Sequence, residues 1–218
     1  MNDRPVDAYV FDLFGTLVDY GALAGRYGDD GSAFTFAWRQ KQLQYAFAAT
    51  IMDRYVDFDA ITERSYAYVS AVYGKATDAA SCAEAVRAWA ELPAFPDAAA
   101  TLRELRARGQ KTVVLSNGTP AGIAATLRSC GLADLLDAAL SVDAVHAFKP
   151  SPKVYRLAVD YVASPPERIG FVSSNGWDAA GAAEYGLAVT WCNRAGLPAE
   201  TFGAAPLRTI ATLRELLD

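Results

Sequence analysis

The sequence has few of the residue types on which several hydrolase mechanisms depend. It contains a single histidine, His146, and no serine lies in a G-x-S-x-G pattern, which argues against a Ser-His-Asp catalytic triad. Its three cysteines, Cys82, Cys130 and Cys192, are far apart and form no CxxC pair, so they indicate neither a disulfide framework nor a zinc site. No HExxH sequence is present, which argues against a zinc hydrolase.

Long hydrophobic runs and a strong excess of one charge are also missing. The net charge is -5 with no block of like charges, so we expect neither nucleic acid nor a membrane surface as a partner. No apolar run approaches the roughly 18 residues of a membrane-spanning helix. Residues Met1–Pro5 lack the apolar region of a secretory signal. The 218 residues suffice for one substantial core, and a cytoplasmic enzyme is expected.

What is present begins with a strand followed by helices. A short apolar strand in Ala8–Leu17 ends at the carboxylate of Asp12. Residues 18–96 contain no convincing strand and more than half of the aromatic residues of the chain. The pattern there predicts three helices, with Asp59 capping the second and Gly74 ending it, over about 34–53, 59–73 and 78–91.

The second half of the chain alternates between strands and helices. Two prolines in Leu92–Asp97 predict a linker. After it we expect strands over 112–115, near 138–141, over 169–172 and over 188–192, and helices over 97–108, 120–130, 151–162, 177–185 and 206–217. This alternation predicts an α/β fold with a parallel sheet covered on both faces. The predicted domains are a core of residues 1–17 and 97–218 and a helical subdomain of residues 18–96.

Polar residues cluster just after the predicted strands. If the strands are parallel, these residues meet at one edge of the sheet, where α/β folds place their chemistry. Each cluster alone is a weak signal, and their equivalent positions make the combination strong. The four clusters are Asp12 with Thr16, Ser116-Asn117-Gly118, Lys149-Pro150, and Ser173-Ser-Asn-Gly-Trp-Asp178.

Each cluster has a catalytic and a structural interpretation. Asp12 could be a nucleophile that attacks carbon or phosphorus. Lys149 could keep Asp12 ionised or form a surface salt bridge. Ser116 and Asn117, with backbone N–H groups, could bind an anion or only form and cap a turn. Asp178 could activate water or cap a helix.

Two further features concern the surroundings of Asp12. Phe14, two residues later, can neither bind a metal nor move a proton. In the segment Trp38-Arg-Gln-Lys-Gln-Leu43 we expect Arg39, Gln40 and Leu43 on one helix face. An arginine among aromatic residues is costly unless it is paired or exposed, and the alternative is a solvated arginine whose stem packs on rings. The aromatic residues of 18–96 could form a small core, line a pocket, or do both.

These residues resemble the haloacid dehalogenase superfamily and, within it, the L-2-haloacid dehalogenases. The superfamily signature is Asp12-Leu-Phe-Gly-Thr16, Ser116-Asn117, Lys149-Pro150 and a final acidic motif. The marks of the dehalogenases are Trp38-Arg-Gln-Lys-Gln-Leu43, Phe148-Lys-Pro with Tyr155, and Phe171-Val-Ser-Ser-Asn-Gly-Trp-Asp178. The similarity covers nearly the whole chain, including the length and position of the helical insert.

The resemblance implies a Rossmann-like core with a helical cap, and a hydrolytic reaction. Asp12 would attack C2 of an L-2-haloalkanoate and expel halide, and water would then hydrolyse the resulting ester. The product would be the 2-hydroxy acid with inverted configuration. The implied partner is a small halogenated carboxylic acid, and relatives of this type are commonly homodimers.

The resemblance also assigns roles to individual residues. Arg39 and Asn117, helped by the ring of Trp177, would receive the halide. Ser116 and backbone N–H groups near Leu13 and Phe14 would hold the substrate carboxylate. The residues that would orient Asp12 and the water, with Thr16 and Tyr155 supporting them, are Lys149, Ser173, Asn175 and Asp178. The residues that would line an apolar pocket around the alkyl group are Phe14, Gln40, Leu43, Phe58 and Trp177.

The resemblance also explains why Phe14 follows Asp12. Phosphatases of the superfamily carry a second Asp at this position and an acidic residue where serines stand here, and Mg²⁺ prefers such oxygen ligands. We therefore expect no metal and no other cofactor. Three alternatives stay open: a haloacetate or fluoroacetate dehalogenase, a Mg²⁺-dependent phosphatase and a non-catalytic binding module. The sequence does not determine halogen preference, alkyl chain length or oligomeric state, and His146 matches no role.

Overall fold

The computed structural model describes residues 6–218, and the segment Met1–Pro5, on which the expectation about a secretory signal rests, lies outside them. Its centre is a six-stranded sheet in the order β3-β2-β1-β4-β5-β6, with every neighbouring pair parallel. The strands are β1 (Ala8–Phe11), β2 (Lys111–Ser116), β3 (Ala138–Ser141), β4 (Ile169–Ser173), β5 (Ala188–Cys192) and β6 (Arg208–Ile210). The parallel sheet confirms the predicted α/β, Rossmann-like fold class.

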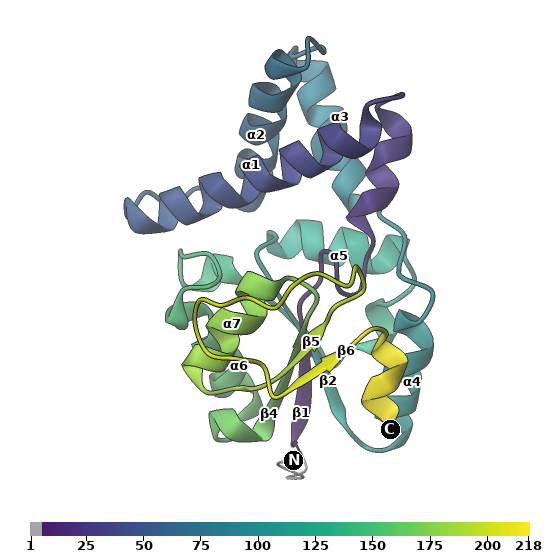
Figure 1. Ribbon diagram of the computed structural model, residues 1–218, viewed down its shortest axis with the longest axis vertical. Helices are drawn as coiled ribbons and strands as arrows, with labels where there is room; N and C mark the ends of the chain where they lie inside the picture. Colours follow the sequence, from purple (N-terminus) through teal and green to yellow (C-terminus); the bar gives the residue numbers. More distant parts are fainter. Residues whose placement is uncertain (1–5) are drawn as a thin grey trace.

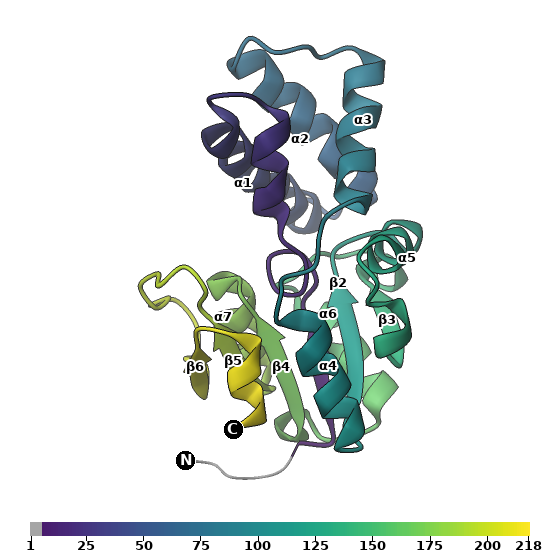
Figure 2. The ribbon, with the colours of Figure 1, turned by 90° about the vertical axis from the view of Figure 1, so that its right-hand side faces the viewer.

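Helices cover both faces of this sheet. On one face, α6 (Pro152–Val162) packs against α7 (Gly176–Tyr185), and on the other, α4 (Ala98–Ala107) packs against the short C-terminal 3-10 helix η5 (Leu213–Leu217) (Figures 1 and 2). Helix α5 (Pro120–Ser129) connects β2 to β3. All five residues of β4 are buried, as expected for a central strand covered on both sides.

The helical insert between β1 and β2 stands above the carboxyl ends of the strands (Figure 1). It contains a 3-10 helix, η1 (Tyr20–Arg26), and the helices α1 (Gly31–Ile51), α2 (Phe58–Val72) and α3 (Ala79–Ala90). We call this whole insert the cap. Trp38 lies at its centre, with ring centroids 5.2 Å from Tyr66 and 5.6 Å from Trp89. These rings therefore form a small core, which is one of the two roles expected for the aromatic residues of the insert.

Two local predictions were wrong, and one short helix was missed. Asp57, not Asp59, caps α2, because its side chain accepts the N–H of Ala60 at 2.8 Å and places the helix start at Phe58. The helix expected over 206–217 is instead the edge strand β6 followed by η5, since Arg208–Ile210 pairs with β5. Helix η1 was not predicted, because its short turn has no repeating apolar pattern.

Among residues 6–218, no helix is long and apolar enough to cross a membrane. The domain boundaries derived from the sequence stay a prediction, although all three helices expected in 18–96 are present.

Candidate active site

Asp12 follows β1 directly and is the centre of a buried hydrogen-bond cluster. Its Oδ2 accepts the hydroxyl of Thr16 at 3.0 Å and the amide of Asn175 at 2.9 Å. Its Oδ1 accepts the ammonium group of Lys149 at 3.0 Å. The side chain is nearly covered, with 8% exposure, so three fixed donors replace the water that would otherwise solvate this carboxylate.

Lys149 joins Asp12 to a second carboxylate. Its Nζ also donates to Asp178 Oδ2 at 3.0 Å, and the hydroxyl of Tyr155 donates to Asp178 Oδ1 at 2.8 Å. Burial alone would lower the pKa of Lys149, but the negative charges of Asp12 and Asp178 outweigh it and raise that pKa above its ordinary value. Burial and the neighbouring Asp178 likewise hold the pKa of Tyr155 well above its usual range. Lys149 is therefore charged and Tyr155 neutral at physiological pH.

Polar side chains at the ends of β2 and β4 hold the surrounding turns together. Ser116 Oγ accepts the N–H of Gly118 at 3.1 Å, and Ser173 Oγ accepts the N–H of Asn175 at 3.2 Å. Asn117 Oδ1 accepts the N–H of Lys149 at 3.0 Å. The turn-forming interpretation of these residues thus holds. It also places their polar groups at the same sheet edge as Asp12.

The cap contributes a buried cation. Arg39 on α1 is 4% exposed, and its guanidinium lies over the rings of Tyr20 and Trp89 at 5.4 and 5.6 Å from their centroids. Burial lowers its pKa, an effect that the charges of Tyr20 and Asp12 oppose. Within residues 6–218, no carboxylate forms a salt bridge with Arg39, and its Nε has no hydrogen-bond partner. A buried, unpaired guanidinium is a site for an anion.

Gln42 orients this arginine and was missed by the sequence analysis. Its Oε1 accepts Arg39 Nη1 at 2.7 Å, while its amide donates to Thr62 of α2 at 2.7 Å. The i,i+3 spacing from Arg39 was the available signal. Gln40, which we expected on the same face as Arg39, is exposed, because consecutive helical residues point about 100° apart. Its pocket-lining role stays a prediction.

The predicted apolar residues lie on both sides of the cluster. Phe14 packs edge to face on Trp89 at 5.1 Å and stacks with Phe58 at 6.2 Å. Leu43 on α1 is buried. Trp177, in the first turn of α7, is half-buried and forms a T-shaped pair with Phe47 of α1 at 5.2 Å, a cap residue that the sequence analysis did not select.

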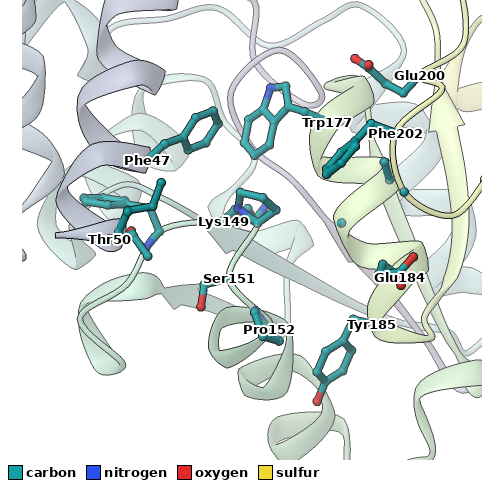
Figure 3. Close-up of a pocket in the computed structure, with 16 residues that line it drawn as sticks. Phe47, Thr50, Lys149, Ser151, Pro152, Trp177, Glu184, Tyr185, Glu200 and Phe202 are labelled. Carbon is teal, nitrogen blue, oxygen red and sulfur yellow. The ribbon is translucent and has the colours of Figure 1, made fainter. Parts of the chain in front are cut away.

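A pocket of about 870 Å³ lies beside the cluster, between the end of α1 and helix α7. Figure 3 shows Phe47 and Trp177 at one end of it and Lys149 at its centre. Most of its lining is apolar, but it also includes two carboxylates, Glu184 and Glu200, of which Glu200 lies near Trp177 in Figure 3. Asp12 and Arg39 do not line this pocket, which borders their cluster through Lys149.

The structure brings most of the predicted polar residues together. Residues 6–218 contain no group of three His, Cys, Asp or Glu side chains placed to hold a metal ion. The cation between the two carboxylates is the ammonium group of Lys149. His146 lies apart, stacked on Tyr55 of the cap with ring centroids 5.0 Å apart.

Comparisons with known proteins agree with this arrangement. Residues 6–186 match the family model of the haloacid dehalogenase-like hydrolases. An (S)-2-haloacid dehalogenase of Pseudomonas putida is 37% identical, over 99% of this chain and 98% of its own. The solved L-2-haloacid dehalogenase RSc1362 superposes with a TM-score of 0.94 at 35% identity, covering 98% of each chain.

A further solved structure is the L-2-haloacid dehalogenase of Xanthobacter autotrophicus with chloropropionic acid covalently bound. It superposes with a TM-score of 0.90 at 34% identity, over 97% of this chain and 96% of that one. The chain therefore belongs to the haloacid dehalogenase-like hydrolases and, within them, to the (S)-2-haloacid dehalogenase family.

Proposed function

We propose that the protein hydrolyses the carbon–halogen bond of L-2-haloalkanoic acids, releasing halide and the 2-hydroxy acid of inverted configuration. One observation carries the proposal: a buried carboxylate, Asp12, bonded to the ammonium group of Lys149 beneath a buried arginine, Arg39, that has no carboxylate partner. A carboxylate nucleophile and an unpaired cation are the two groups that expulsion of a halide from carbon requires. The names of the relatives support the same reaction.

In the first step, an Asp12 oxygen attacks C2 of the substrate from the side opposite the halogen. Oδ1 accepts one hydrogen bond and Oδ2 accepts two, so Oδ1 has the freer lone pair. The new C–O bond forms as the C2–halogen bond breaks, and the halide leaves with the bonding electrons. Arg39, with Asn117 and Trp177, would receive it. A halide needs no proton to leave, which is consistent with an apolar residue, Phe14, two positions after Asp12.

The substrate carboxylate needs hydrogen-bond donors near Asp12. Within residues 6–218, the backbone N–H groups of Leu13 and Phe14 have no intramolecular acceptor. The neighbouring N–H groups are bonded: that of Asp12 to Val172 O at 2.9 Å and that of Gly15 to Val18 O at 2.8 Å. Two adjacent free N–H groups form a cradle for an anion, with the Ser116 hydroxyl as a third donor.

In the second step, water attacks the Asp12 carboxyl carbon of the ester. The water oxygen becomes part of the Asp12 carboxylate, and the bond from the carboxyl carbon to the oxygen attached to C2 breaks. One proton of the water ends on that oxygen, which gives the hydroxy acid, and the other passes to the solvent. Asp178 would take the proton from the water. Its fixed position between Lys149 and Tyr155, with Ser173 and Asn175 nearby, supports this role. The configuration at C2 inverts once, in the first step.

We also propose that the reaction needs no metal and no organic cofactor, and that the protein acts as a homodimer in the cytoplasm. The ammonium group of Lys149 supplies the positive charge between Asp12 and Asp178. Ile51 and Met52 at the end of α1 are exposed, an apolar surface that a second copy could cover. Light scattering of the purified protein tests the dimer.

The test of the reaction is a screen for halide release in the presence of EDTA. Its substrates are fluoro-, chloro- and bromoacetate and both enantiomers of 2-chloropropionate. We expect chloride from the L enantiomer and none from the D enantiomer. Asp12→Asn should abolish release, whereas Asp134→Asn, at an exposed site, should not. Turnover by Asp12→Asn would refute the nucleophile. Phosphate release from p-nitrophenyl phosphate that requires Mg²⁺, without halide release, would favour a phosphatase instead.

A further inference from the structure

The segment that leads into Lys149 is held by the cap. Thr50, in the last turn of α1, accepts the backbone N–H of Phe148 on its Oγ1 at 2.9 Å. The same hydroxyl donates to the carbonyl of Ala46 at 3.1 Å, which fixes its orientation on the helix. Figure 3 shows Thr50, on α1, beside Lys149, and both residues line the pocket.

The next amide along the chain is held by the core. The N–H of Lys149 donates to Asn117 Oδ1 at 3.0 Å, so the two consecutive N–H groups are bound from opposite sides. Phe148 and Lys149 are both buried, and a buried N–H without an acceptor is unfavourable. The position of the Lys149 backbone, and with it the reach of its ammonium group to Asp12, thus depends on one bond from each side.

Tyr55, in the loop after α1, holds the same segment further upstream. Its ring stacks on Phe148 and His146, with centroids 5.1 and 5.0 Å apart, and its hydroxyl donates to Asp143. Burial and the adjacent carboxylate raise the pKa of Tyr55, so the hydroxyl stays a donor. The stack covers a left-handed backbone at His146, where φ is 49°, a conformation that L residues rarely adopt. This contact gives the single histidine a structural role.

Helix α1 carries Arg39 as well as Thr50. The two residues are eleven positions apart, about 16 Å along the axis of a continuous helix, so they move together. A shift of α1 would displace the anion-binding guanidinium and loosen the Lys149 segment at once. The Thr50–Phe148 hydrogen bond joins this helix to the segment that carries Lys149.

We propose that Thr50 is a positioning residue for dehalogenation, with Tyr55 in support. Its hydrogen bond to Phe148 fixes the placement of Lys149 against Asp12 and the register of Arg39 above them. The effect on catalysis rests on the proposed function. The effect on the Lys149 segment does not, because the contact is present without substrate.

The experiment compares Thr50→Val, which keeps the shape and removes the acceptor, with Thr50→Ser, which restores it. The matched control is Thr35→Val on the same helix, because Thr35 is buried and its hydroxyl has no partner among residues 6–218. Two readouts are needed: kcat and KM for L-2-chloropropionate, and hydrogen–deuterium exchange of residues 143–149 without substrate. Tyr55→Phe, which keeps the ring stack, tests the bond to Asp143.

We expect Thr50→Val to lower kcat about tenfold or more with little change in KM, because misplaced catalytic groups affect the reaction more than binding. It should also speed exchange in residues 143–149 and leave α4 unchanged. Thr50→Ser should recover most of the activity, and Thr35→Val should behave as wild type. If Thr50→Val shows the same exchange and the same kcat as Thr35→Val, the proposal is overturned. If wild type releases no halide, the proposed function fails, and the exchange data alone then decide the positioning role.

Discussion

The ammonium group of Lys149 lies 3.0 Å from an oxygen of Asp12 and also 3.0 Å from an oxygen of Asp178, so one buried cation serves two buried carboxylates. Arg39 supplies the second buried positive charge from the cap. Two anions and two cations thus share the site, but both hydrogen-bonded pairs belong to Lys149. This uneven pairing leaves Arg39 free for an incoming anion and makes Lys149 important for stability as well as catalysis.

Replacing Lys149 with Met should destabilise the fold and abolish halide release. The substitution leaves Asp12 and Asp178 buried without their cation, a change that costs about 3–5 kcal/mol at neutral pH. Urea unfolding and halide release measure the two effects. Lys153→Met, at an exposed position, is the control. Adding Asp178→Asn should restore part of the lost stability, and a double variant no more stable than Lys149→Met would contradict this explanation.

The pH dependence should follow the raised pKa of Lys149. A cation whose pKa is higher in the folded than in the unfolded protein stabilises fully below the unfolded value, and that stability is lost as the pH rises through the folded value. Here the unfolded value is about 10.5, and the raised pKa of Tyr155 acts in the same direction. We expect halide release and the urea midpoint to stay level with respect to these two groups up to about pH 10.0, the ordinary pKa of Tyr155. A decline in stability centred well below that pH would show that burial lowers the pKa of Lys149 more than the two carboxylates raise it.

Arg39→Met should lower activity with little change in stability. The guanidinium is buried without a carboxylate partner, so its removal relieves a desolvation cost that offsets the lost hydrogen bond to Gln42, and we expect a net change within about 1 kcal/mol. Loss of the anion-binding cation should reduce kcat about 100-fold or more. The comparison is Arg194→Met, which removes an arginine paired with Asp97 at 2.9 Å and should cost about 3 kcal/mol. Equal destabilisation by the two variants would show that Arg39 has a partner in solution.

The sequence predicts the lower half of the site better than the upper half. Asp12, Asn117, Lys149 and Asp178 follow or lie near the ends of parallel strands, and the geometry of such a sheet brings strand ends together whatever the loops do. Their contacts could therefore be anticipated from spacing. Their catalytic roles stay predictions until activity is measured.

The cap contributions were harder to predict. Gln42, Phe47 and Thr50 take part only because α1 lies across the strand ends at a particular angle and height, which is set by packing over the whole cap. The closing strand β6 was missed for a related reason. Its three residues are held by pairing with β5 at the sheet edge, and such a short segment has no periodicity of its own.

Gly181 provides a test of how closely α7 must approach the catalytic segment. A Cβ at this position would lie 2.5 Å from Pro150 Cβ and 2.9 Å from the Tyr155 hydroxyl, closer than packed atoms allow. Gly181→Ala must therefore push α7 away from Pro150, and α7 carries Asp178 in its first turn. We expect a loss of about 1–3 kcal/mol and a fall in kcat of about tenfold.

The control for this prediction is Gly25→Ala in η1, where a Cβ would meet no atom within 4 Å. It should keep full activity, so that any difference from Gly181→Ala reflects the clash and not the loss of a glycine. Urea unfolding and halide release from L-2-chloropropionate measure both variants. Gly181→Ala combined with Tyr155→Phe relieves the contact with the Tyr155 hydroxyl but not the closer one with Pro150 Cβ, and it also removes the hydrogen bond to Asp178. The double variant should therefore be no more stable and no more active than Gly181→Ala, and recovery of kcat would show that the contact with the Tyr155 hydroxyl, and not the contact with Pro150 or the Tyr155–Asp178 bond, limits the reaction.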